Sequence, residues 1–238
     1  MSNSRKLVIL LIVSLLLVFI GSFVASQFNS SKGDVDVTRI YFETPRGELS
    51  GLLYKPKGAD EQPRPTIVAT HGYLNSGEMQ APQAIEMSKR GYVVLALDQY
   101  DHGHSHNSTE KPIPFFSFWP FAIYDAVQYM YEQDYVLKDE EGNGIIAVSG
   151  HSMGGFSSTH AVVLDEQDFA ETGVRKIHSY LTMGSDYQWV KTYGLTVEEI
   201  VDSYGPRFAG KIAGVYDEFF FNPQKLQHQG NLFRRKTM

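Results

Sequence analysis

The chain has 238 residues, of which 42% are hydrophobic and 13% aromatic, so it can form one domain with a sizeable core. Its formal net charge of −6 argues against sequence-independent binding to nucleic acid, because such binding needs a cationic surface. The chain contains no cysteine, which excludes disulfides, thiol catalysis and cysteine-ligated zinc.

An apolar segment opens the chain. Arg5 and Lys6 precede a run without charged residues that extends from Leu7 to Ala25. In helical form, roughly 20 apolar residues cross a hydrocarbon core of about 30 Å. The basic residues before the run therefore predict a single-pass membrane helix, with residues 1–26 as the anchor and the rest of the chain extracytoplasmic.

A cleaved signal peptide is the alternative for this segment. Val24-Ala25-Ser26 offers small residues at a plausible cleavage point. The apolar run is longer than the roughly 7–15 residues of a signal-peptide core, which favours the uncleaved anchor. Residues 27–34 are polar and small, which predicts a short linker over residues 27–36. Residues 37–238 are expected to form one domain.

Short strand-like segments follow in chain order. Residues 37–42 and 49–54 are rich in strand formers and flank a Pro-Arg-Gly turn, which predicts an antiparallel hairpin. Five apolar runs, each followed by polar or glycine-rich sequence, are typical of buried parallel strands. These runs are residues 66–70, 92–97, 144–148, 176–183 and 211–216.

Helical patterns separate these runs. Residues 79–90 end at Gly91 as helices often do, and residues 119–133 carry apolar side chains at helical spacing. Alternating strands and helices predict an α/β sandwich around a mostly parallel central sheet.

The segment Gly150-His151-Ser152-Met153-Gly154 lies between the run 144–148 and a segment, 156–164, that can form a helix. Gly-x-Ser-x-Gly in this context is typical of a nucleophile elbow, a sharp turn that exposes the serine hydroxyl above the strand ends. Gly150 and Gly154 supply the small residues that so tight a turn needs. A glycine-rich turn in which Ser152 has no catalytic role is the alternative.

Two further motifs complete a resemblance to the α/β-hydrolase superfamily, closest to its monoglyceride-lipase and serine-aminopeptidase S33-like branch. His71-Gly72-Tyr73 resembles the oxyanion segment of that family, about 80 residues before the serine. Residues 98–105 resemble its Asp-x-Arg-Gly-x-Gly-x-Ser loop, except that Tyr100 stands at the arginine position and Asp101 at the glycine position.

The resemblance implies roles for individual residues. Ser152 would be the nucleophile, and the backbone N–H groups of Tyr73 and Met153 would form the oxyanion hole. His71 and Gly72 would shape the oxyanion segment, with the His71 ring holding the loop.

The triad order of this fold, serine, then acid, then histidine, directs the search for the other two residues. Asp217 follows the run 211–216 and is the expected acid, with Glu218 next and Asp186 as a choice one strand earlier. His228 is the only histidine after Asp217, and the spacing is shorter than a helix and a strand require. We therefore expect this chain to be an N-terminal portion of a longer protein, lacking the last strand and helix, with His228 as the alternative base.

The sequence as a whole predicts a serine hydrolase that cleaves acyl esters through an acyl-enzyme intermediate, without a cofactor. A peptidase of the serine-aminopeptidase type is the first alternative, and a membrane-tethered binding module without catalysis is the second. The expected partners are a small or lipid-like acyl substrate and the membrane. His102, His104 and His106 alternate as metal ligands can, but the loop resemblance accounts for them, and we expect no metal site.

Overall fold

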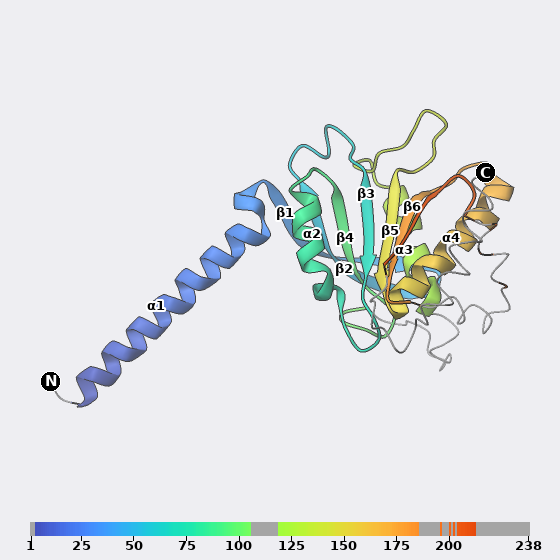
Figure 1. Cartoon of the computed structure of the whole chain (residues 1–238). Coiled ribbons are helices and arrows are strands. Elements are labelled where there is room, and N and C mark those ends of the chain that lie inside the picture. The colour runs from blue at the N-terminus through green and yellow to red at the C-terminus, as the bar shows by residue number, and fades with distance from the viewer. Residues whose placement is uncertain are drawn as a thin grey trace.

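A computed structural model describes residues 3–105, 119–185, 196, 200, 202 and 204–212. Its centre is a seven-stranded sheet in the order β1-β2-β4-β3-β5-β6-β7 (Figure 1). The strands are β1 Val35–Thr44, β2 Gly47–Pro56, β3 Thr66–Thr70, β4 Val93–Asp98, β5 Ile146–His151, β6 Ile177–Met183 and β7 Phe208–Ile212. The helices are α1 Asn3–Asn29, α2 Ala81–Ser88, α3 Ala122–Tyr131 and α4 Met153–Thr172, with 3-10 turns at Ser31–Gly33, Gly77–Gln80 and Trp119–Phe121.

The sheet is mixed and mostly parallel, which confirms the predicted architecture. β1 and β2 form an antiparallel hairpin that closes at Thr44 opposite Gly47, and β2 runs antiparallel to β4. β4, β3, β5, β6 and β7 pair in parallel. The carboxyl ends of these five strands therefore lie at one edge of the sheet, where α/β proteins place their sites.

Helices cover both faces of the sheet. α2 packs on β2 and β4, where its Ala84 joins a small apolar cluster with Tyr54 and Val94. α3 and α4 pack on the other face and against each other, over a larger core that includes Leu95 and Val148. β4 is buried at every position, as a continuous apolar run between two helical layers should be.

The amino-terminal helix stands apart from this domain. Figure 1 shows α1 as a long rod extending away from the sheet, and none of its residues is buried. By length and composition it is the one helix among the described residues that could cross a membrane, and a signal sequence would pass the same test.

Two element boundaries differ from the expected ones. The segment 27–36, expected as a linker, is divided between the end of α1, a 3-10 turn at Ser31–Gly33 and the start of β1 at Val35. β7 begins at Phe208 rather than at 211, because it pairs with β6 from Ser179 opposite Phe208 onward. Its residues are exposed or half-buried, so burial does not impose an apolar pattern there.

Candidate functional site

Ser152 lies at the junction of β5 and α4, at the carboxyl edge of the sheet. Its backbone has φ 53° and ψ −115°, a strained conformation for a residue with a side chain. Its N–H donates to the carbonyl of Met183 at the end of β6, at 2.8 Å, which ties the turn to the neighbouring strand. The residue is half-buried and sits at the amino end of a 20-residue helix, whose dipole favours negative charge there.

The two glycines of the motif allow this turn to close. A Cβ on Gly150 would lie 2.2 Å from the carbonyl carbon and oxygen of Gly154. A Cβ on Gly154 would lie 2.5 Å from the carbonyl oxygen of His71. Both distances are far below van der Waals contact with backbone atoms, so neither position accepts a larger residue without moving the turn.

The segment His71-Gly72-Tyr73 runs directly beside the elbow. A Cβ on Gly72 would lie 3.3 Å from the Ser152 Cβ and 3.2 Å from Nδ1 of His151, so the peptide after Gly72 adjoins the serine. The Tyr73 side chain is 58% exposed. The structure thus places Gly72, the residue before Tyr73, beside Ser152, the residue before Met153.

His71 is fully buried and holds this segment in place. Its Nδ1 lies 2.7 Å from the Gly72 carbonyl oxygen, and its Nε2 accepts the backbone N–H of Gln99 at 3.1 Å. The side-chain amide of Gln99 also donates to the His71 carbonyl, at 2.7 Å. Burial lowers the pKa of His71, which favours the neutral ring that these bonds require.

Asp98 fixes the loop after β4. This fully buried carboxylate accepts hydrogen bonds from the backbone N–H of Gly77 at 2.6 Å and of His104 at 3.0 Å. Arg39 on β1 pairs with it at 3.0 Å. Ser105 Oγ donates to the Asp98 carbonyl at 2.7 Å, so the first and last residues of the motif close the loop on itself.

Tyr100, which occupies the arginine position of the loop motif, is fully buried. Its hydroxyl donates to Asp125 on α3 at 2.6 Å and also bonds Thr44 in the hairpin turn. Arg46 pairs with the same carboxylate at 2.6 Å. Burial raises the pKa of Asp125, and Tyr100 and Arg46 act against this rise.

The histidines of this loop do not converge on a common point in the described part of the chain. Both ring nitrogens of His102 lie within hydrogen-bonding distance of backbone atoms, and the His104 ring is 54% exposed beside Asp98. Among the described residues, no three His, Asp or Glu side chains are grouped as a metal site would need. His106 lies outside the described residues.

The expected acid and base also lie outside the described residues. Asp217, Glu218 and His228 follow the last described residue, Ile212, and Asp186 follows Ser185 in another such segment. β7 ends at the same edge as Ser152, and the Ile212 carbonyl accepts the N–H of Gly184 at 2.9 Å. Ile212, the last described residue, therefore lies at the same edge of the sheet as Ser152.

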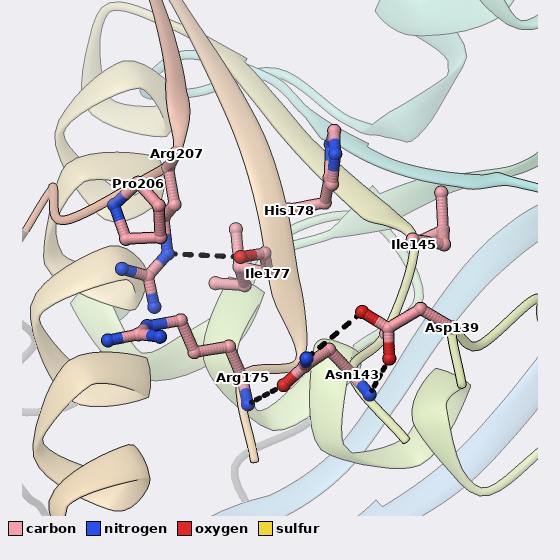
Figure 2. Close-up of a pocket in the computed structure, with 9 residues that line it drawn as sticks. Asp139, Asn143, Ile145, Arg175, Ile177, His178, Pro206 and Arg207 are labelled. Carbon is pink, nitrogen blue, oxygen red and sulfur yellow. Dashed lines mark hydrogen bonds between the residues drawn. The ribbon is translucent and has the colours of Figure 1, made fainter. Parts of the chain in front are cut away.

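A hollow of about 210 Å³ lies at the opposite edge of the sheet from Ser152, where β5, β6 and β7 begin (Figure 2). Arg207 and Arg175 line it, and both pair with Glu166 on α4, at 2.7 and 2.8 Å. Arg207 also pairs with the buried Asp165 at 2.6 Å and donates to the Ile177 carbonyl at 3.0 Å. The ion pairs of these arginines connect α4 to β6 and β7, which is a structural role. We therefore do not place the active site in this hollow.

The mostly parallel sheet and the turn at Ser152 are those of an α/β-hydrolase-like fold. Residues 61–174 match the family described as serine aminopeptidase, S33, a range that contains the oxyanion segment, the Asp98 loop and the elbow. Over these residues the chain is similar to this family. No curated protein sequence matches the chain.

Solved structures of similar fold include esterases. The Pyrococcus furiosus esterase Pf2001 is 15% identical with a TM-score of 0.52, over 87% of this chain and 95% of that one. The hypothetical protein PA2218 from Pseudomonas aeruginosa is 22% identical with a TM-score of 0.52, over 71% and 50% of the two chains. Esterase Est22 is 12% identical with a TM-score of 0.51, over 67% and 46%. The chain thus spans about half the length of the last two, and identities this low support the fold alone.

Proposed function

We propose that this protein is a serine hydrolase that cleaves acyl esters, with Ser152 as its nucleophile. The observation that carries the proposal is the strained Ser152 backbone, directly beside the Gly72–Tyr73 peptide and at the amino end of α4. Strain at a solvent-accessible serine is characteristic of functional sites. Because esterases are among the proteins of similar fold, acyl esters are the first substrate class to test.

In the proposed reaction the Ser152 Oγ forms a bond to the ester carbonyl carbon while a histidine removes its proton. The carbonyl oxygen becomes an anion that accepts hydrogen bonds from the N–H groups of Tyr73 and Met153. The bond to the alcohol oxygen then breaks, and the alcohol leaves with the proton from the histidine. Water, activated by the same histidine, releases the acid and restores the serine. We propose Asp217 as the carboxylate that orients this histidine, and His228 as the histidine available in this chain.

A fluorophosphonate probe tests the nucleophile. Full-length protein should become covalently labelled, and Ser152→Ala should abolish the labelling. Ser149→Ala is the matched control, because Ser149 lies on β5, the strand that leads to Ser152, and is only 5% exposed. This variant should leave labelling unchanged. Folded full-length protein that is never labelled would refute the proposal and would favour a binding module.

The family description supports a peptidase as the second candidate. Ser152-dependent turnover of p-nitrophenyl butyrate, compared with that of amino-acid p-nitroanilides, separates the two. Faster cleavage of the anilides would assign the protein to the peptidases.

We further propose that α1 anchors the domain to a membrane and leaves it extracytoplasmic. Its exposed apolar side chains, such as Leu10 and Phe19 at 63% and 71%, support this role. An anchored protein resists extraction by alkaline carbonate and keeps its full mass. Release at a mass that lacks the first 25 residues or so would identify a cleaved signal peptide instead.

A further inference from the structure

Leu74, the residue after Tyr73, has a backbone conformation that its side chain does not favour. Its φ is 58°, in the left-handed region that leucine rarely adopts, and its side chain is 78% exposed. Packing of the side chain therefore does not hold it there. The Leu74 N–H donates to Nε2 of His102 at 3.2 Å, which is a direct restraint on this backbone.

His102 is built to accept that hydrogen bond. The residue is 8% exposed, and its Nδ1 lies 2.9 Å from the carbonyl oxygen of Tyr100. A carbonyl oxygen only accepts, so Nδ1 carries the proton and Nε2 is left as the acceptor for Leu74. The ring also lies 5.2 Å from the His71 ring and 5.9 Å from the Tyr73 ring, centroid to centroid.

The two imidazoles hold successive peptides on either side of Tyr73. His71 donates from Nδ1 to the Gly72 carbonyl, and because a trans peptide is planar this also fixes the direction of the Tyr73 N–H. His102 holds the next peptide through the Leu74 N–H. With both peptides fixed, the Tyr73 N–H cannot rotate independently of the loop after β4.

We propose that His102 is a positioning residue that keeps the Tyr73 N–H aimed at the substrate oxygen, by accepting the Leu74 N–H at Nε2. This inference rests on the proposed hydrolase function. The buried imidazole would thereby stabilise the transition state without touching the substrate, since the oxyanion donor acts only when it is already oriented. Substrate binding in the ground state depends less on this alignment.

Two amide side chains separate this role from simple packing. In His102→Gln the amide oxygen reaches the position of Nε2 and can still accept the Leu74 N–H. In His102→Asn the amide reaches only the position of Nδ1, so the bond to Tyr100 can persist while the bond to Leu74 is lost. His104→Phe is the matched control, because its ring lies in the same loop but is 54% exposed.

The measurement is the rate of fluorophosphonate labelling of the full-length protein, resolved into probe affinity and the limiting rate of bond formation. Loss of an oxyanion donor typically lowers rates by about 10²–10³, so a misaligned donor in His102→Asn should lower the limiting rate by at least roughly tenfold. Its probe affinity should stay within about threefold of the wild-type value. His102→Gln should recover most of the rate, and His104→Phe should match the wild type.

Equal limiting rates for His102→Asn and the wild type would overturn the proposal, as would equal losses in the Asn and Gln variants. A wild-type protein that the probe never labels would instead contradict the hydrolase function itself. Nitrogen-15 NMR of the histidine rings gives a readout without catalysis, and should show the His102 ring neutral and protonated at Nδ1. A proton on Nε2 would also overturn the proposal, because that nitrogen could not accept from Leu74.

Discussion

His160 on α4 should make the stability of the domain depend on pH. Its side chain is 7% exposed and lies edge-on to the Phe121 ring at 5.0 Å and nearly parallel to the Phe156 ring at 6.3 Å. Burial, and to a lesser extent the charge of Arg46, lower its pKa from 6.5 to about 4. A buried imidazolium loses its hydration, so the folded protein keeps the ring neutral.

The sign of the effect follows from proton binding. Between pH 6.5 and 4 the unfolded chain protonates His160 and the folded protein does not, so acid favours unfolding. The contribution of His160 is fully present above pH 6.5 and decreases as the pH falls towards 4. At pH 5 these two pKa values correspond to a loss of about 2 kcal/mol in the free energy of unfolding, and below pH 4 to a loss of about 3 kcal/mol.

Urea unfolding at pH 7.5 and pH 5.0 measures this effect. His160→Leu should lose about 2 kcal/mol less than the wild type between the two pH values, because packing changes in the variant are common to both conditions. His178→Asn, at an exposed histidine of β6, should keep the wild-type difference. The same loss in His160→Leu and the wild type would show that the ring is protonated, or reaches solvent, in the folded state.

Two further substitutions test the elbow and the helix-to-strand junction. Gly150→Ala should lower the free energy of unfolding by about 3 kcal/mol and abolish probe labelling. The reason is that the added carbon would lie 2.2 Å from the Gly154 carbonyl. Unchanged urea midpoints would contradict this prediction. Arg207→Met should lower the free energy of unfolding by about 3–5 kcal/mol, because the buried Asp165 loses its cation. Removal of the exposed Arg90 charge should change the free energy of unfolding by less than about 1 kcal/mol. Similar losses from both arginines would refute the assigned burial.

Much of the architecture could be predicted because burial on both faces imposes apolar runs. β4 is such a strand, and the run 92–97 predicted it within one residue at each end. β7 was placed too late, because this strand is exposed or half-buried at each position and has no such pattern. The Ser152 turn was predictable for a different reason: its geometry admits only glycine at 150 and 154.

The Nε2 bond of His102 could not be predicted, because a backbone N–H leaves no sequence signal of its partner. The same limit applies to the acid and base, since the positions of Asp217 and His228 relative to Ser152 depend on chain outside the described residues. The order of the triad along the sequence therefore remains the basis for those two assignments.

The Tyr100 departure from the family loop shows where a sequence comparison can mislead about substrate. A tyrosine at an arginine position next to a site suggests an altered substrate contact. Tyr100 is instead fully buried, its hydroxyl donates to Asp125, and the cation beside that carboxylate is Arg46 from the hairpin turn. Tyr100 thus contacts the core beneath the loop, in the described part of the chain, through Asp125 and Thr44. Substrate preference should accordingly follow residues around Ser152, rather than the loop position that Tyr100 occupies.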